Sequence, residues 1–311
     1  MNKVSIVIPT LNAAAELPAL LARISRQTLK PTEVLVIDCA SSDETRALAQ
    51  ARGASVVTIR REDFDHGGTR NLALQRACGD VIVFTVQDAQ PVGDDWIEQL
   101  VAPIGADPRV GAVTGRQIAR HDASPLERLT RDLTYGTTAR RRAFEDLRTL
   151  GLPAAFCSDA NAAYPVAALR KVGGFPQPCI VNEDMAAAIR LMKTGYTVVY
   201  QPSAAVVHSH AYGFVDQVRR HFDIGVFLAT SEEIGKVATP RRDALYYLKA
   251  QFLHVIAERR VGLLAAWCVD VIARAIGSLL GIRYHLLPHS LRVRLSRQRA
   301  YWTRKVNMTG R

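Results

Sequence analysis

The sequence has few cysteines, and none of the five stands in a C-x-x-C pair. An odd number of widely spaced cysteines predicts neither a disulfide framework nor a zinc knuckle, and it is typical of a reducing compartment. Aromatic residues are also scarce, at 7%. Because a nucleic-acid-binding surface interleaves aromatic with basic side chains, we expect no nucleic-acid partner.

The chain also lacks a recognisable export signal. Its first apolar run is short and stops at Pro9, whereas the core of a signal peptide is longer. No internal repeat or low-complexity segment is evident in the sequence. We therefore expect a cytoplasmic protein that consists of one large domain, or of one domain with an appendage.

The composition indicates a folded protein with a basic end. The 311 residues are 48% hydrophobic and 22% charged, which suffices for a sizeable core. The net charge is +11, and residues 241–311 contain only three acids, Asp243, Glu258 and Asp270. A positive field favours anionic partners such as lipid or phosphorylated substrates, so we expect the partner surface near the C-terminal end.

Short β-rich runs alternate with helical patterns along the N-terminal part. The runs lie at residues 4–8, 33–37, 55–59 and 80–86, and the helical patterns near 16–25, 43–52 and 69–77. Alternation of this kind predicts an α/β fold, and the almost continuous apolar strands predict a mostly parallel sheet with helices on both faces. Farther on we expect a basic helical insertion at 126–150, a helix at 185–193 and a strand at 197–200.

Polar residues follow several of these strands, where parallel sheets bind ligands. Asp38 follows the second strand and can accept a hydrogen bond from a uracil or thymine ring, although Ser42 and Asp43 beside it can simply cap the next helix. Residues 65–71 read Asp-His-Gly-Gly-Thr-Arg-Asn, in which the glycines permit close approach of a ligand and Arg70 offers donors to a diphosphate. A tight turn with a surface arginine is the alternative.

Acids and histidines stand at further strand ends and at one helix start. Asp88 ends the fourth strand, where one carboxylate can hold Mg²⁺ or Mn²⁺ against a pyrophosphate. His208 and His210 share one face of a strand, and His208 becomes a credible ligand only together with Asp88. Glu183 and Asp184 precede a helix, where one can accept a proton from a hydroxyl, although two acids at a helix start are also common for dipole reasons.

The longest apolar stretch, residues 261–282, could cross a bilayer by its length. It contains Asp270 and Arg274, and a charge near the centre of a spanning helix costs about 2.5–3.5 kcal/mol. We therefore expect an amphipathic helix in the membrane interface, flanked by arginines. A basic helical subdomain or dimer arm without lipid contact is the alternative.

Taken in order, these stations resemble the inverting GT-A glycosyltransferases of family 2. The resemblance covers residues 2–225 and rests on an opening Val-Ser-Ile-Val-Ile-Pro-Thr-Leu-Asn, then Val-Ile-Asp-Cys-Ala-Ser-Ser-Asp, an Arg-Asn, an aspartate after the fourth strand and a later Glu-Asp. Residues 64–71, Gln87-Asp88-Ala89, His208-Ser209-His210 and residues 219–225 resemble the bacterial rhamnosyltransferase branch.

The resemblance implies a GT-A fold with a C-terminal helical segment. It implies a nucleotide-sugar-binding half (1–110), an acceptor-binding half (111–225) and a basic amphipathic helical region (226–311). It also implies a site: Asp184 as catalytic base beside Glu183, a metal on Asp88 and His208, and nucleotide-sugar contacts from Pro9, Thr10, Asn12, Asp38, Asp65, His66, Arg70 and Gln87.

One departure from the family concerns its Asp-x-Asp metal motif. The matching positions are Val86-Gln87-Asp88, so only the second aspartate is present. Use of Mg²⁺ or Mn²⁺ by Asp88 is still implied, whereas contacts of the first aspartate are lost.

The resemblance implies a metal-assisted single displacement from dTDP-L-rhamnose to a lipid-linked or cell-surface polysaccharide acceptor, at the inner face of the cell membrane. Two other functions stay open. A catalytically silent scaffold would be consistent with the lost aspartate, but the remaining acids are all present. A sugar nucleotidyltransferase would need a glycine-rich, lysine-containing loop after the first strand, and residues 9–12 lack it.

Overall fold

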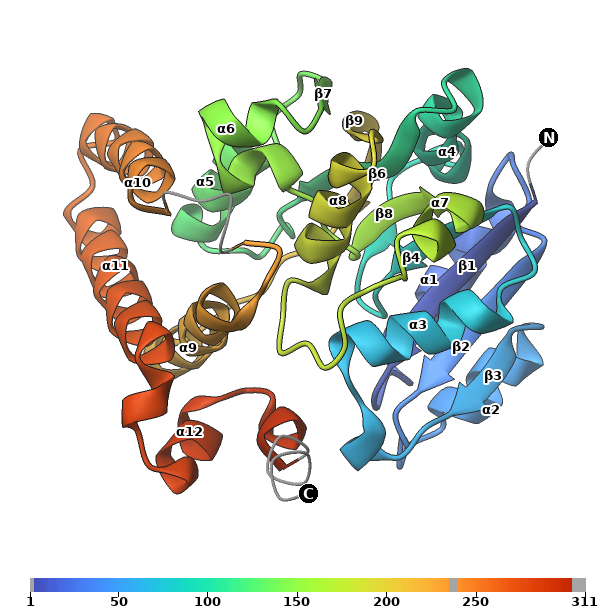
Figure 1. Ribbon diagram of the computed structural model, residues 1–311, viewed down its shortest axis with the longest axis horizontal. Helices are drawn as coiled ribbons and strands as arrows, with labels where there is room; N and C mark the ends of the chain where they lie inside the picture. Colours follow the sequence, from blue (N-terminus) through green and yellow to red (C-terminus); the bar gives the residue numbers. More distant parts are fainter. Residues whose placement is uncertain (1–2, 235–239, 304–311) are drawn as a thin grey trace.

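The computed structural model describes residues 3–234 and 240–303. Its N-terminal part alternates strands and helices as expected (Figure 1). The elements are β1 (Val4–Thr10), α1 (Leu17–Arg26), β2 (Glu33–Asp38), α2 (Thr45–Ala51), β3 (Ser55–Thr58), a 3-10 turn η1 (Arg61–Asp63), α3 (His66–Arg76) and β4 (Val81–Thr85). The four strands pair in parallel in the order β3-β2-β1-β4. The carboxyl ends of β1, β2 and β4 therefore lie at one edge.

The second half extends the same sheet and introduces antiparallel pairs. It contains β5 (Gln90–Pro91), α4 (Trp96–Ala106), β6 (Val110–Ile118), α5 (Pro125–Thr134), β7 (Arg140–Arg142), α6 (Asp146–Leu150), η2 (Leu152–Ala155), β8 (Asn161–Pro165), α7 (Val166–Lys171), α8 (Glu183–Lys193) and β9 (Thr197–Val207). Strand β8 runs antiparallel between β4 and β6, and β9 pairs in parallel with β6. The predicted helical insertion at 126–150 thus contains the short strand β7 as well as two helices.

Helices cover both faces of the sheet, as the apolar strands predict. The strands β1 and β4 are buried almost throughout. One apolar core joins the sheet to α3, α7 and α8, and a second joins the other face to α1, α2 and α4. The architecture is that of the GT-A fold, so this prediction is confirmed.

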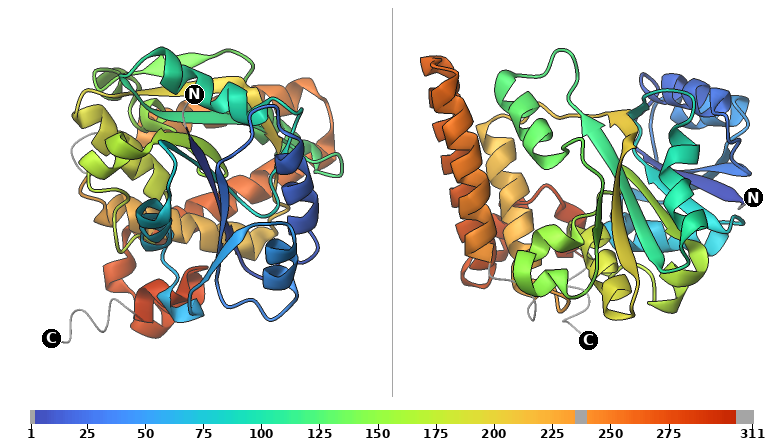
Figure 2. Two further views of the ribbon diagram at one scale, coloured as in Figure 1. Left: turned by 90° about the vertical axis from the view of Figure 1, so that its right-hand side faces the viewer. Right: turned by 90° about the horizontal axis from the view of Figure 1, so that it is seen from above.

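The C-terminal helices pack on the outside of the second half of the chain. They are α9 (Phe214–Thr230), α10 (Pro240–Ala257), α11 (Val261–Ile282), a turn η3 (Tyr284–Leu286) and α12 (His289–Leu295). Helix α11 lies alongside α9 and is the outer of the two, as Figure 2 shows. The contact is close because Gly277 and Gly281 of α11 face the backbone of α9, where Gly225 meets Gly281. The predicted boundary at residue 225 falls inside α9.

The exposed face of α11 is apolar. Val261 is 83% exposed, and Val269, Ile272, Ile276, Leu279 and Ile282 are each at least 40% exposed. Asp270 and Arg274 form an ion pair at 2.6 Å, and Asp270 also accepts a hydrogen bond from Gln217 of α9. The two charges that argue against a membrane span therefore face α9. By length and composition α11 can cross a membrane, and only 17% of its most apolar window is buried.

Candidate functional site

The loops after β1 and β2 are joined through Asp38. This carboxylate is fully buried and accepts hydrogen bonds from the Thr10 hydroxyl (3.2 Å), the Ser41 hydroxyl (2.5 Å) and the Ser41 N–H (3.0 Å). Asn12 adopts a positive φ of 50°, and its side-chain oxygen accepts from the Ser42 N–H (3.0 Å). Pro9 lies half-buried in β1, opposite Ile37 of β2. These contacts hold the two loops together at the edge where the sequence predicts a nucleotide.

Gln87 connects the same edge to β4. Its side-chain oxygen accepts from the Leu11 N–H (2.9 Å), and its amide donates to the Leu11 carbonyl (3.4 Å). Gln87 thus fixes the backbone between Thr10 and Asn12, next to Asp88.

Asp88, His208 and His210 meet in one cluster, with ligand atoms within 4.8 Å of one another. His208 Nε2 lies 3.6 Å from one Asp88 oxygen, and His210 Nδ1 lies 3.8 Å from the other. His208 is brought there because β9 continues to Val207, well past the predicted end at residue 200. From the sequence, His208 is predicted as a ligand together with Asp88, whereas His210 is not, and the structure brings both imidazoles to the same carboxylate.

The donor set of this cluster fits a divalent cation. His208 Nδ1 lies 2.9 Å from the Gln117 side-chain oxygen, which can only accept, so the Nδ1 carries the proton. The Nε2 lone pair is then directed towards Asp88, and this buried nitrogen has no hydrogen-bond partner within the described residues. Burial also holds the pKa of His208 well below its usual range, followed by repulsion from His210 and nearby arginines. A carboxylate is a usual ligand of Mg²⁺ and Mn²⁺, and a neutral imidazole beside it suits a divalent transition metal.

A second cluster surrounds Arg70 of α3. Its side chain is 7% exposed and pairs with Asp159 (Nε to Oδ2, 2.5 Å) and with Glu183 (Nη1 to Oε1, 2.9 Å). Asp159 also accepts from the buried Tyr164 hydroxyl (2.6 Å). Burial opposes ionisation of Glu183, but Arg70 and then His66 outweigh it and lower the pKa of Glu183 to about 2. The guanidinium predicted to meet a diphosphate is thus engaged by two carboxylates.

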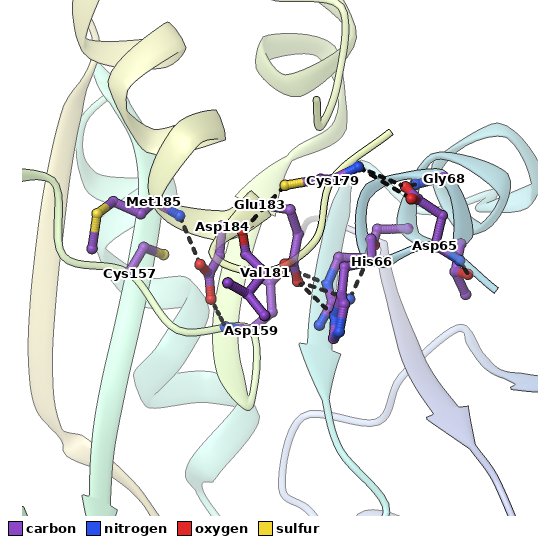
Figure 3. Close-up of polar contacts among 12 residues, drawn as sticks. Asp65, His66, Gly68, Cys157, Asp159, Cys179, Val181, Glu183, Asp184 and Met185 are labelled. Carbon is purple, nitrogen blue, oxygen red and sulfur yellow. Dashed lines mark hydrogen bonds and ion pairs between the residues drawn. The ribbon is translucent and has the colours of Figure 1, made fainter. Parts of the chain in front are cut away.

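Asp184 lies beside Glu183 and Asp159 (Figure 3), and it is only partly buried. One of its oxygens accepts from the Asp159 N–H (3.1 Å) and the other from the Met185 N–H (2.7 Å). Burial raises the pKa of Asp184 well above the usual value, and the neighbouring carboxylates of Glu183 and Asp159 raise it further. A partly exposed carboxylate with a raised pKa is suited to accept a proton from a hydroxyl.

Residues 65–68 have a different arrangement from the one predicted. Asp65 is the N-cap of α3 and accepts from the Gly68 N–H (2.8 Å), and it also accepts from the Cys179 N–H (3.1 Å). His66 lies 3.7 Å from Glu183 (Figure 3). The prediction that the glycines let a ligand approach is wrong, because Gly67 lies inside α3 and a Cβ there would collide with the Pro176 carbonyl. The small size of these glycines leaves room for the loop that precedes α8.

Two buried residues of the site are absent from the sequence predictions. Asp159, 1% exposed, holds Arg70 and Asp184, and Gln117, 2% exposed, orients His208. Asp159 could have been noticed in the sequence, because it lies in the short run Ser158-Asp159-Ala160-Asn161 that leads into a strand. Gln117 has no such signal, because a single glutamine in a long strand has many ordinary explanations.

Comparison with known proteins agrees with the resemblance to family 2 glycosyltransferases. Residues 5–173 match the family model described as Glycosyl transferase family 2. The chain is 34% identical over 303 residues to the O-antigen chain rhamnosyltransferase RfbN of Salmonella typhimurium, covering 96% of each chain. It is 32% identical over 305 residues to the O-antigen chain rhamnosyltransferase WbaN of Salmonella anatum, covering 97% of this chain and 96% of the relative.

Solved structures of low sequence identity share the fold. A mannosyltransferase from Pyrobaculum calidifontis, in complex with GDP-mannose and Mn²⁺, superposes with a TM-score of 0.57 at 22% identity, covering 97% of this chain and 85% of that one. Glucosyl-3-phosphoglycerate synthase from Mycobacterium tuberculosis, in complex with Mn²⁺, UDP-glucose and phosphoglyceric acid, gives 0.51 at 20% identity, covering 76% and 81%.

Proposed function

The chain belongs to glycosyl transferase family 2 and is a glycosyltransferase, and from this premise we propose that it transfers L-rhamnose from dTDP-L-rhamnose, with inversion, to a hydroxyl of an O-antigen-type acceptor. The donor and the acceptor follow the names of its two full-length relatives. The observation that carries the chemical assignment is the partly exposed Asp184 carboxylate, whose pKa is raised beside the ionised Glu183.

Asp184 is the proposed base. It accepts the proton of the acceptor hydroxyl as that oxygen attacks the anomeric carbon from the side opposite the departing diphosphate. Glu183 stays ionised on Arg70, and its negative charge helps to raise the proton affinity of Asp184. The backbone N–H groups of Asp159 and Met185 fix the direction of the carboxylate. The donor side is supported by three residues in an indirect way. Asp65 joins α3 to the loop before α8, while Arg70 and His66 hold Glu183 in place.

The proposed cofactor is Mg²⁺ or Mn²⁺ on Asp88 and His208. Either ion would supply positive charge that stabilises the leaving diphosphate. Gln117 keeps the Nε2 of His208 free to coordinate, which is the protein's own contribution to the site.

The nucleoside is assigned to the edge formed by the loops after β1 and β2. Asp38 is proposed to lie nearest the base, with Pro9, Thr10, Asn12 and Gln87 shaping the backbone around it. This edge adjoins Asp88 because β1 and β4 are neighbours in the sheet. The order nucleoside, diphosphate and sugar then runs from Asp38 past Asp88 towards Asp184.

We also propose that α11 lies on the inner face of the membrane. Its exposed face is apolar, its charges face α9, and Arg259, Arg260 and Arg283 stand at its two ends. An amphipathic helix with basic ends binds an anionic bilayer surface. The contact of its other side with α9 supports the proposal that α11 lies in the interface and does not span the membrane.

A donor screen tests the function. Purified protein with Mg²⁺ or Mn²⁺ is offered dTDP-, UDP- and GDP-sugars, and slow hydrolysis to the nucleoside diphosphate is followed. We expect selective hydrolysis of dTDP-rhamnose, its loss in Asp88→Ala, and no change in the matched surface variant Asp94→Ala. Binding of donors without any hydrolysis or transfer would instead favour a silent scaffold, and release of pyrophosphate from dTTP and rhamnose 1-phosphate would indicate a nucleotidyltransferase.

A further inference from the structure

The run of residues 219–225, one of those that resemble the rhamnosyltransferase branch, lies in α9 and contacts the C-terminal part of the chain. After α11 the chain turns back below α9 in the view of Figure 1, and α12 packs against α9. Phe222 of this run is fully buried, and its ring lies 6.2 Å from that of Trp302, which is 1% exposed. The C-terminal segment, residues 296–303, is therefore anchored in the folded core.

Asp223 of the same run fixes the start of the C-terminal segment. Its carboxylate is buried and accepts hydrogen bonds from the Ser296 hydroxyl (2.6 Å) and from the Arg297 N–H (2.9 Å). A buried carboxylate is costly without such partners, so the two bonds are maintained in the folded protein. They fix the backbone of Arg297, and with it the position from which the arginine side chain extends.

The side chain of Arg297 reaches the loop that follows β9, residues 208–213. Its guanidinium carbon lies 4.8 Å from the centre of the Tyr212 ring, closer than the guanidinium of Arg220 from α9, which lies at 5.2 Å. A guanidinium over an aromatic face is attracted by the ring electrons. This contact joins the C-terminal segment to the loop that carries His208 and His210.

Ring contacts continue from Tyr212 to the cluster around Asp88. The Tyr212 ring lies 5.2 Å from the His210 ring, and the His210 ring lies 4.5 Å from the His208 ring. His210 Nδ1 is in turn 3.8 Å from an Asp88 oxygen. A row of contacting side chains, formed by Arg297, Tyr212 and His210, therefore ends at the residues proposed to hold the metal.

We infer that Asp223 and Arg297 are positioning residues of the active site: Asp223 holds Arg297, and Arg297 holds Tyr212 so that His210 faces Asp88. This inference rests on the proposed function, because it concerns the metal site proposed there. Tyr212 and His210 are only partly buried, so their rings depend on such contacts more than buried rings do. If the contacts only stabilised the C-terminal segment, their loss would lower Tm and leave metal binding unchanged.

Binding of Mn²⁺ tests this role without relying on turnover. Mn²⁺ alone is titrated into the full-length protein, and its affinity is measured by calorimetry. We expect Arg297→Gln to weaken Mn²⁺ binding roughly two- to fivefold, the effect of losing one cation–π contact at a partly exposed site. Arg297→Lys, which keeps a cation near the ring, should restore most of the affinity. Arg299→Gln, at an exposed arginine two positions later, is the matched control and should bind Mn²⁺ like the wild type.

Variants of Asp223 and Tyr212 test the other two steps. Asp223→Leu removes both acceptor oxygens and should weaken Mn²⁺ binding as Arg297→Gln does. The two changes combined should weaken it no further, because Asp223 acts through Arg297. Tyr212→Phe keeps the ring and should bind Mn²⁺ like the wild type, whereas Tyr212→Leu should resemble Arg297→Gln. All affinities are compared below the Tm of each variant, and the Arg297 variants, which change an exposed side chain, keep the test valid if Asp223→Leu does not fold.

The outcomes separate a positioning role from a structural one. Equal Mn²⁺ affinities of Arg297→Gln and Arg299→Gln would overturn the inference, and so would a lower Tm of Asp223→Leu without a loss of Mn²⁺ affinity. Asp88→Ala shows which claim has failed. If the wild type binds Mn²⁺ and Asp88→Ala does not, equal arginine variants refute the inference alone. If the wild type binds no Mn²⁺, or if Asp88→Ala binds it equally well, the proposed metal site is refuted and the inference with it.

Discussion

Arg70 offers a direct test of how the carboxylate cluster around Asp184 is held together. Its guanidinium is the cation between the buried carboxylates of Asp159 and Glu183, at 2.5 and 2.9 Å. Arg70→Met keeps much of the side-chain volume and removes the charge. The two carboxylates, at 1% and 4% side-chain exposure, then lose the arginine charge that neutralises them in the interior.

The expected loss of stability is large. Removing one partner of a buried ion pair costs about 3–5 kcal/mol, because the other charge stays buried and uncompensated. In a domain of 150–250 residues each kcal/mol lowers Tm by about 2–4 °C, so Arg70→Met should melt roughly 6–20 °C below the wild type. Arg109 is the matched control, since it pairs with Asp107 at the surface and is 73% exposed. An exposed pair of this kind contributes little to stability, because water and salt screen it.

The stability lost in Arg70→Met should depend on pH in a defined direction. Glu183 has its folded-state pKa lowered to about 2. A carboxyl of this kind adds stability that is complete above its unfolded pKa of about 4.3 and is lost as the pH falls towards the folded value. The difference in Tm between the wild type and Arg70→Met should therefore be largest near neutral pH and shrink as the pH falls towards the folded pKa of about 2.

Thermal denaturation followed by circular dichroism, supported by urea titration, measures these differences. Adding Glu183→Gln to Arg70→Met should recover part of the stability, because one of the unpaired charges is then removed. The reasoning fails if Arg70→Met loses no more stability than Arg109→Met, or if the loss is the same at every pH.

Three further predictions concern the base, the metal ligand and the outer helix. Because the pKa of Asp184 is raised, the rising limb of the pH–rate profile should lie above the ordinary aspartate range, and the stability of the protein should fall as the pH rises through that raised pKa. Asp184→Asn should abolish both the transfer and this fall in stability. A rising limb at the ordinary aspartate value would exclude Asp184 as the base. Gln117→Leu removes the acceptor for His208 Nδ1 and should weaken Mn²⁺ binding about 10–100-fold by calorimetry, and unchanged affinity would contradict the metal assignment. Gly281→Ala should lower Tm because its Cβ meets the backbone of α9, whereas Gly262→Ala, with open space around it, should raise Tm slightly; equal shifts would contradict the packing described for α11.

The strands and most helices could be predicted because local sequence determines them. Buried parallel strands need continuous apolar runs, and β1, β2 and β4 have them. The predicted helix at 261–282 agrees with α11 at both ends. Strand β9 was predicted too short because Gln201-Pro202-Ser203 interrupts its apolar pattern. In the structure β6 and β9 change register there, with Gly115 opposite Gln201 and Arg116 opposite Ala205, and the strand continues.

Partners across the fold could not be predicted from local patterns. Arg70 follows two glycines at the start of a helix, which resembles a phosphate-binding arrangement. Only the tertiary structure shows that Asp159 and Glu183 pair with its guanidinium. Gly67 needs its small size because of Pro176, more than a hundred positions away. By contrast, Asp88 and His208 were paired correctly, since both follow strands that end at the same edge.

The Arg70 cluster also limits how this chain can change in evolution or be recombined. Arg70 comes from the N-terminal half, while Asp159, Glu183 and Asp184 come from the second half, and Asp88 likewise meets His208 and His210 across the same divide. A chimera that takes its N-terminal half from another relative must therefore bring an arginine at position 70, or the proton affinity of Asp184, the proposed base, changes with it. The two halves of the chain are then constrained to change together.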